Sequence, residues 1–232
     1  MTVQPLKRRR AARGSGEQLR DEILDATTDL LLETGHAKAV SIRSVAQRVG
    51  VTPPSIYLHF ADKDTLLDAV CARYFEKLDE EMQRAAADQP SAIEVLRAQG
   101  LAYVRFATKT PELYRIATMG EGRPGSDVDV ALNSSAFEHM RSAIESLMAE
   151  GVYPAGDSTA FVLELWAAAH GVAAMLISRP YMPWGDAEVF TDRVLRAMCA
   201  GHIMSGVIDP ELPPQEAISR LKGMLDEQQH RR

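Results

Sequence analysis

The side chains best suited to binding chemistry gather in one short stretch, residues 41 to 63. Hydroxyl, guanidinium, phenol, imidazole and ammonium groups occur there, and all of them can hydrogen-bond to phosphate oxygens or to base edges. Together with the proline that lies among them, the residues of interest are Ser41, Arg43, Ser44, Thr52, Pro53, Ser55, Tyr57, His59 and Lys63. Arg43 is the best candidate for guanine recognition, because its fork can bond two acceptors at once. A solvent-facing role for Arg43 is the alternative.

Apolar spacing predicts a first short helix in this stretch. The apolar positions recur at steps of three and four residues, which places them on one helical face: Ile42, Val45, Ala46 and Val49. Ser41 precedes them as a candidate N-cap, and Gly50 follows them, where a residue that tolerates positive φ ends a helix. The pattern therefore predicts a packed helix followed by a tight turn.

A second helix is predicted from Thr52 or Pro53 to about His59. Proline is tolerated in a first helical turn, but a following proline disfavours helical backbone at Pro53, so its place inside or just outside the helix stays open. Ile56 and Phe60 face inward, which leaves polar side chains on the other faces. This arrangement is typical of a helix-turn-helix unit that reads a major groove.

The stretch resembles the N-terminal DNA-binding domain of the TetR family of transcriptional regulators over about 50 residues, from Arg20 to Val70. The matching positions are Val45, Ala46, Gly50, Val51, Thr52, Ile56, Tyr57, His59, Phe60, Lys63, Leu66 and Leu67. The Pro53–Pro54 pair departs from the family's usual pattern. The resemblance implies a homodimer on double-stranded DNA, with reading helices about 34 Å apart on a pseudo-palindromic operator. It also implies the residues that contact DNA, at phosphates or base edges: Ser41, Arg43, Ser44, Thr52, Pro53, Ser55, Tyr57, His59 and Lys63. It also implies repression as the commoner outcome.

Residues 164–180 resemble the tryptophan-histidine-glycine type of C-terminal domain of the same family, through Trp166, His170 and Gly171. In that family the last long helices pair across a two-fold axis. Small side chains here would allow close helix approach: Ala167, Ala168, Gly171 and Ala174. An intramolecular core helix is the alternative.

The resemblance implies that the C-terminal half senses a small apolar or amphipathic effector, whose binding weakens operator binding. Aromatic and thioether side chains there could line a cavity: Tyr103, Phe106, Met119, Phe137, Met140, Trp166, His170 and Met175. Arg105 or His139 would supply a polar group. Each side chain alone more often serves the core than a ligand contact.

Helical periodicity continues along the rest of the chain, and no β-type alternation of useful length interrupts it. The predicted segments are 17–33, 63–87, 91–109, 111–118, 128–150, 157–179, 186–205 and 214–227. We therefore predict an all-α fold of nine or ten helices. A basic arm (1–16) precedes a helix-turn-helix domain (17–62), and a helical ligand-sensing and dimerisation domain (63–232) follows, with 63–88 as the connecting helix.

Composition agrees with an intracellular globular protein. At 232 residues and 46% hydrophobic, the chain can bury one or two cores without disulfides or metal. Cys71 and Cys199 lie far apart in apolar helical patterns, which favours buried free thiols in a reducing cytoplasm. Residues 1–20 hold six basic side chains and one acid within a chain of net charge −6. This arm is suited to phosphate contact, although a merely solvated tail is the alternative.

Other functional classes find little support. The basic start lacks the apolar region of an export signal, and the best membrane candidate, 160–178, contains Glu164 and His170 and is better interpreted as a buried helix. Residues 120–125 spell G-x-G-x-x-G without the preceding strand, and 127–138 lack part of a calcium loop. No zinc motif or nucleophile elbow occurs, so we expect no cofactor and no enzyme activity. A DNA-binding protein without an effector, constitutive or architectural, remains the main alternative.

Overall fold

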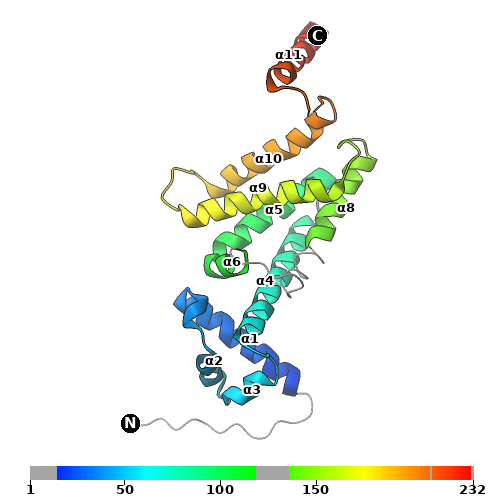
Figure 1. Ribbon diagram of the computed structural model, residues 1–232. Coiled ribbons are helices and arrows are strands. Elements are labelled where there is room, and N and C mark those ends of the chain that lie inside the picture. The colour runs from blue at the N-terminus through cyan, green and yellow to red at the C-terminus, as the bar shows by residue number, and fades with distance from the viewer. Residues whose placement is uncertain (1–14, 119–135, 210, 231–232) are drawn as a thin grey trace. The chain divides into compact units, whose positions relative to one another are not determined.

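The computed structural model describes residues 15–118, 136–209 and 211–230 (Figure 1). Within these ranges the chain forms ten α-helices and one 3-10 turn, with no strand, which confirms the predicted all-α class. The elements are α1 (Ser15–Thr34), η1 (Ala37–Ala39), α2 (Ile42–Val49), α3 (Pro53–Tyr57), α4 (Lys63–Ala86), α5 (Ala92–Lys109), α6 (Pro111–Thr118), α8 (Ala136–Ala149), α9 (Ser158–Ser178), α10 (Ala187–Ser205) and α11 (Pro214–His230). The basic arm up to residue 14, Met119 and the glycine-rich segment after it lie outside the described residues.

The chain divides into two compact units. The first comprises residues 1–80 and 106–136, and the second comprises 81–105 and 137–232. Helix α4 belongs to the first unit up to Glu80 and to the second from Glu81. The predicted domain boundary at residue 63 therefore falls inside the first unit.

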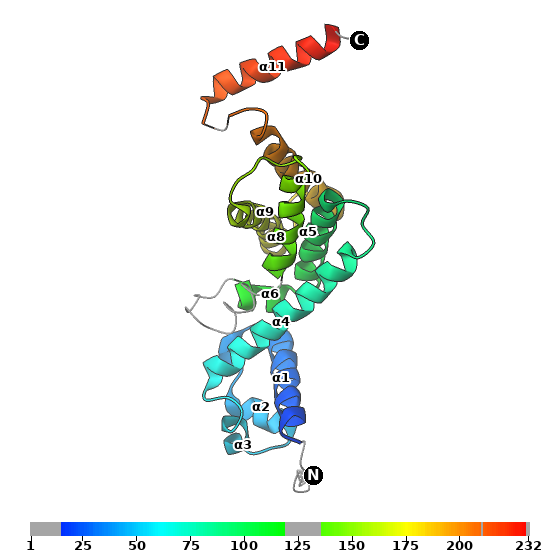
Figure 2. The same cartoon turned by 90° about the vertical axis from the view of Figure 1, so that its right-hand side faces the viewer.

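The first unit is built on one apolar core. Helix α1 packs against α2 and α6, and α2 packs against α3. The side chains that were predicted to face inward are buried: Val45, Ala46, Ile56 and Phe60. Both ribbon views place α6 near the C-terminal end of α1, and α3 toward the other end of that helix (Figures 1 and 2).

Polar contacts hold the helices of the first unit together. The Arg48 guanidinium donates to both carboxylate oxygens of Glu33, at 2.9 and 2.6 Å, which ties the end of α2 to α1. The Arg20 guanidinium lies over the Phe60 ring, 5.3 Å from its centroid. Arg48 thus has a structural role in the first unit, and in this respect it differs from Arg43 on the same helix.

The second unit packs α9 against α10. One face of α9 is buried: Val162, Leu165, Ala169, Val172, Ala173 and Ile177. By length and composition α9 is the one helix among the described residues that could cross a membrane. Such a helix is weak support for a span, because the core helix of a globular protein has the same length and composition. The buried face agrees with the predicted core role.

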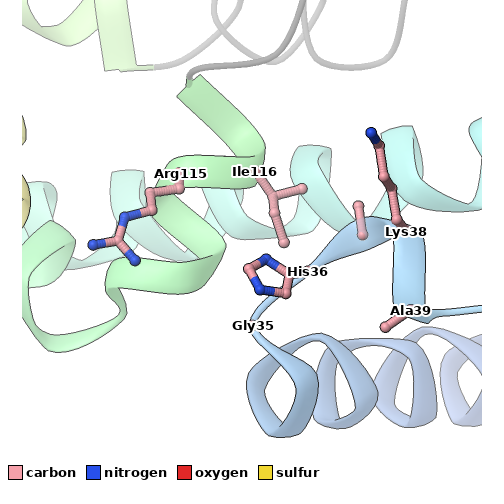
Figure 3. Close-up of a pocket in the computed structure, with 7 residues that line it drawn as sticks. Gly35, His36, Lys38, Ala39, Arg115 and Ile116 are labelled. Atoms are coloured by element: carbon pink, nitrogen blue, oxygen red, sulfur yellow. The ribbon is translucent and has the colours of Figure 1, made fainter.

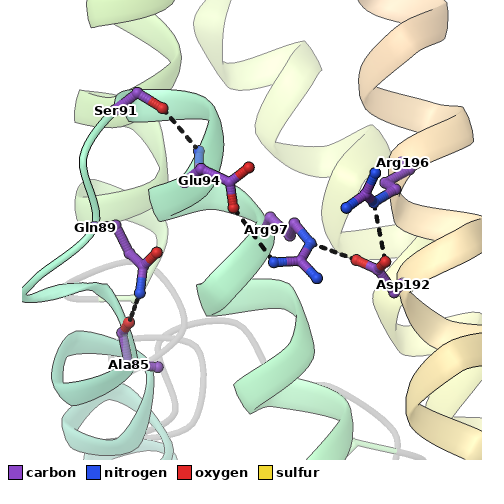
Figure 4. A network of polar contacts seen from close by, with 7 residues as sticks. All are labelled: Ala85, Gln89, Ser91, Glu94, Arg97, Asp192 and Arg196. Atoms are coloured by element: carbon purple, nitrogen blue, oxygen red, sulfur yellow. Dashed lines mark hydrogen bonds and ion pairs between the residues drawn. The ribbon is translucent and has the colours of Figure 1, made fainter.

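A charged network joins α5 to α10 in the second unit (Figure 4). Arg97 Nε donates to Asp192 Oδ1 at 2.5 Å, and Arg196 Nε donates to Asp192 Oδ2 at 2.9 Å. Arg97 also reaches Glu94 Oε2 at 3.3 Å. The hydrogen bond from Arg97 is the main cause that lowers the pKa of the Asp192 carboxyl below its usual value.

Asp192→Asn should therefore destabilise the protein at neutral pH by under about 1 kcal/mol, since the pair is partly solvated. A carboxyl with a lowered folded pKa contributes stability above its unfolded pKa, about 4, and loses it as the pH falls through the folded value. The difference between wild type and variant should therefore shrink below about pH 4 in urea titrations. Glu188→Gln, an exposed change on the same helix, is the control, and a pH-independent difference would contradict the prediction.

Candidate nucleic-acid interface

The start of α2 is fixed by a reciprocal pair of serines. Ser41 Oγ accepts from the Ser44 amide at 3.1 Å, and Ser44 Oγ accepts from the Ser41 amide at 2.9 Å. Ser41 is the N-cap, as predicted, and Ser44 completes a capping box that the sequence analysis did not anticipate. Both hydroxyls therefore help to begin the helix, and Arg43 is the exposed cation of this turn.

The turn between α2 and α3 depends on Gly50. Its φ of 78° lies in the left-handed region, and its amide donates to the Ala46 carbonyl, as does the amide of Val51 at 2.9 Å. A side chain at this φ would be strained, so the predicted role of glycine is confirmed. Thr52 is extended and caps α3, which begins at Pro53. Pro53 thus lies inside the helix, in its first turn.

Helix α3 ends at Tyr57, two residues before the predicted end at His59. Leu58 and His59 form a turn instead, because the amides of His59 and Phe60 both donate to the Ile56 carbonyl, at 2.9 and 3.0 Å. Phe60 follows this turn and is 2% exposed in the core. The helix is thus two residues shorter than the predicted span to about His59.

All nine predicted DNA-contact residues lie at or near the surface of the first unit. Five are exposed: Ser41, Arg43, Thr52, Pro53 and Tyr57. Four are half-buried: Ser44, Ser55, His59 and Lys63. They lie in the first turn of α2, in α3 and its flanks, and at the first residue of α4. We call this set the reading surface; its individual contacts with DNA stay a prediction.

Leu58 was not among the predicted contact residues, yet it is 85% exposed beside Tyr57. An apolar side chain this exposed is suited to contact with a thymine methyl group. The signal was present, because with Ile56 and Phe60 facing inward the apolar Leu58 between them lies outside. Leu58 is therefore added to the reading surface.

Family models match most of the two units. The model described as "Bacterial regulatory proteins, tetR family" matches residues 23–70, and "Tetracyclin repressor-like, C-terminal domain" matches residues 96–198. The chain belongs to the TetR family of transcriptional regulators. Its first unit contains the TetR-family DNA-binding domain, and the nine residues above lie on or directly beside the helix-turn-helix of that domain.

Curated relatives match this TetR-family chain over a limited length. An HTH-type transcriptional repressor of Mycobacterium tuberculosis is 40% identical over 78 residues, which is 34% of this chain and 41% of that protein. A nucleoid occlusion factor, SlmA, from Vibrio campbellii is 28% identical over 97 residues, 42% of this chain and 50% of that protein. The matches thus span about half of each relative or less.

Solved structures share the fold over most of the chain. A protein of unknown function from Rhodococcus sp. RHA1 has a TM-score of 0.70 and 23% identity, covering 87% of this chain and all of that one. The transcriptional regulator FadR from Bacillus subtilis, in complex with stearoyl-CoA, has a TM-score of 0.65 and 14% identity, covering 78% and 98%. At these identities the likeness shows the TetR-family fold alone.

The second unit encloses a small cavity of about 20 Å³. Its lining residues are Met82, Leu96, Gly100, Tyr103, Met140, Leu165, Trp166, Ala169, Leu195 and Cys199. Three of them were predicted for a ligand pocket: Tyr103, Met140 and Trp166. The others were missed because apolar residues on any amphipathic helix have the same pattern, whichever space they face.

Two more predicted residues gather beside this cavity. The Phe137 and His170 rings lie 5.6 and 5.3 Å from the Trp166 ring, and His170 Nδ1 lies 3.4 Å from the Tyr103 hydroxyl. Burial lowers the pKa of His170, which favours a neutral imidazole at pH 7. Tyr103, Phe137, Trp166 and His170 are called the aromatic cluster below.

The remaining predicted ligand residues lie elsewhere. Phe106 belongs to the first unit, where its ring packs 5.1 Å from that of Tyr74. Met175 is 46% exposed on α9, and the exposed Arg105 and His139 do not line the cavity. Among the described residues no group of three or more His, Cys, Asp or Glu side chains could hold a metal ion.

Proposed function

We propose that this chain acts as a homodimeric repressor that is released from a pseudo-palindromic operator by a small molecule bound in the second unit. The observation that carries the proposal is the enclosed cavity beside the aromatic cluster, in a unit distinct from the one that bears the reading surface. Helix α4 runs without a break from the first unit into the second. A movement of its C-terminal part would therefore be transmitted along the helix to the first unit.

The reading surface supplies the DNA-binding half of the proposal. Arg43 would bond a guanine edge, Tyr57 and the hydroxyls of α3 would contact bases or phosphates, and Lys63 would contact a phosphate. These contacts follow from exposure and residue type, since the same segment directs Ile56 and Phe60 into the core.

Exposed apolar side chains on α9 and α10 support the homodimer. Leu163 and Met175 on α9 are 48% and 46% exposed, and Val189 on α10 is 65% exposed. The small residues Ala167 and Gly171 on α9 would let a partner helix approach closely. A two-fold pairing of these helices would bury this surface and set two reading helices about 34 Å apart.

The cavity favours a neutral, largely apolar effector. None of its lining side chains is charged, and among the described residues no acceptor lies within hydrogen-bond distance of Trp166 Nε1. At about 20 Å³ the space is close to the size of one water, so a larger effector must displace side chains such as Met82 and Met140. This displacement would change the packing of α4. A coupling free energy of roughly 1 to 3 kcal/mol between effector binding and operator binding would then weaken operator binding by about one or two orders of magnitude.

Tryptophan fluorescence tests the proposed effector site, because the chain has only two tryptophans, Trp166 and Trp184. In a Trp184→Phe variant, an apolar effector found by thermal shift should change the Trp166 emission and release a selected operator fragment over the same concentration range. Trp166→Phe in the wild-type background is the control. An effector that alters the Trp166 emission but leaves operator affinity unchanged would remove the sensing role.

The alternative function, DNA binding without an effector, is favoured by the small size of the cavity and by the nucleoid occlusion factors among the relatives. Selection from genomic fragments separates the two functions. Recovery of one or a few palindromic sites supports a regulator, whereas retention of fragments regardless of sequence supports the architectural alternative.

A further inference from the structure

We propose that the first unit holds a binding site for a small anion in a groove between η1 and α6. The groove has a volume of about 750 Å³ and is lined by Gly35, His36, Ala37, Lys38, Ala39, Arg115 and Ile116. In the view of Figure 3 the His36 ring points toward Ile116, with Arg115 to one side and Lys38 to the other. The site lies wholly within one compact unit, and it is separate from the cavity of the second unit.

The charged side chains that line the groove indicate which class of ligand it would bind. Lys38 is exposed and has no carboxylate partner among the residues that the structure describes, and His36 beside it is exposed as well. Arg115 brings a guanidinium from α6, with its Nη1 donating to Glu112 Oε1 at 2.7 Å. Cationic N–H donors from two elements favour a phosphate or carboxylate. None of the described lining residues is acidic, and the Glu112 carboxylate, which approaches Gly35, is paired with Arg115.

The walls also offer apolar contact. Ile116 and Ala37 pack against the core of the first unit and line the groove at the same time. A ligand that combines an anionic group with a short apolar body would therefore match both kinds of wall. The inferred class is a small organic phosphate or carboxylate.

The groove is formed before any ligand arrives. Gly35, with φ 69°, ends α1, and its amide donates to the Leu31 carbonyl at 2.8 Å. The amide of Ala39 donates to the His36 carbonyl at 3.0 Å, which holds the lysine-bearing turn. A Cβ at Gly35 would lie only 3.7 Å from a Glu112 carboxylate oxygen, so α6 approaches this turn closely. A preorganised site loses less entropy on binding.

One wall of the groove lies close in sequence to the reading surface, and the other wall belongs to α6. Helix α6 lies near one end of α1 and α3 lies toward the other end in both ribbon views (Figures 1 and 2). Ala39 precedes the N-cap of α2, Ser41, by two residues. An anion that ties α6 to this segment would therefore act on the start of the helix that carries Arg43.

The imidazole proton signals of His36 in the full chain provide the test. Titration with inorganic phosphate, and separately with hexanoate, at constant ionic strength should shift the His36 signals to saturation; His36→Gln assigns them. Lys38→Gln should weaken binding about tenfold, the loss expected from one charge-assisted contact. Lys77→Gln, a matched exposed lysine of the same unit, should leave binding unchanged.

Three outcomes would overturn the proposal. They are a shift that does not saturate with either anion, equal weakening by Lys38→Gln and Lys77→Gln, and a His36 response only to duplex DNA. Arg115→Gln provides a second variant from α6, with its helicity checked by circular dichroism. Weakening by both Lys38→Gln and Arg115→Gln, in folded protein, supports the site.

Discussion

The combined change Arg43→Ala, Tyr57→Phe and Lys63→Gln should lower operator affinity by about 100-fold or more, at roughly 1 kcal/mol or more for each lost contact. None of the three side chains is buried, so the free energy of unfolding should stay within about 1 kcal/mol of wild type. The measurement is titration of a fragment selected from genomic DNA at fixed salt, with urea unfolding of the same samples. Loss of the Lys63 contact should also reduce the salt dependence of binding.

A control of the same residue types is available on the second unit. Arg84, Tyr181 and Lys222 are all exposed there, so Arg84→Ala, Tyr181→Phe and Lys222→Gln remove the same groups away from the reading surface. This triple variant should bind the fragment like wild type. Unchanged DNA affinity in the first triple variant, or an equal loss of affinity in both variants, would contradict the assignment of the reading surface.

Phe60→Ala should destabilise the first unit by about 3 to 5 kcal/mol, the usual cost of removing a buried aromatic ring. Phe60 is 2% exposed, its amide bonds to the Ile56 carbonyl, and the Arg20 guanidinium lies over its ring. Truncation to alanine removes the ring from the core and from its contact with Arg20, while the backbone hydrogen bond to Ile56 remains. Urea unfolding followed by circular dichroism should show the loss.

Leu58→Ala is the matched control for this change, because Leu58 lies two residues away and is 85% exposed. Its effect on the free energy of unfolding should stay within about 0.5 kcal/mol. Phe60→Ala should also lose DNA binding, but in proportion to the unfolded fraction, and binding should recover at lower temperature. Similar destabilisation by the two variants would contradict the assigned burial.

Local rules predicted most of the helix boundaries. Ser41 and Gly50 delimit α2 because a capping hydroxyl and a residue that adopts positive φ are needed at those positions whatever the rest of the chain does. The predicted segment at 111–118 coincides with α6, which begins at Pro111. The end of α3 was not predictable in this way, because neither a glycine nor a proline follows Tyr57 to mark it in the sequence.

Sequence patterns within a few residues did not predict which side chains line the cavity. Tyr103 and Phe106 lie one helical turn apart on α5, and both were predicted to line one pocket. The structure places Tyr103 beside the cavity of the second unit and Phe106 against Tyr74 in the first. Periodicity identifies an apolar face, but it does not say which neighbour covers each part of that face.

The amino-acid sequence by itself determined the all-α class, the helix-turn-helix and the division of its side chains into buried and exposed sets, since these depend on spacing within a few residues. Only the tertiary structure decided which distant residues share a space. Trp166 joins Tyr103 at the cavity, and Lys38 joins Arg115 at the groove. The physical reason is that such neighbours are set by the packing of whole helices, a property that no short segment of the chain contains.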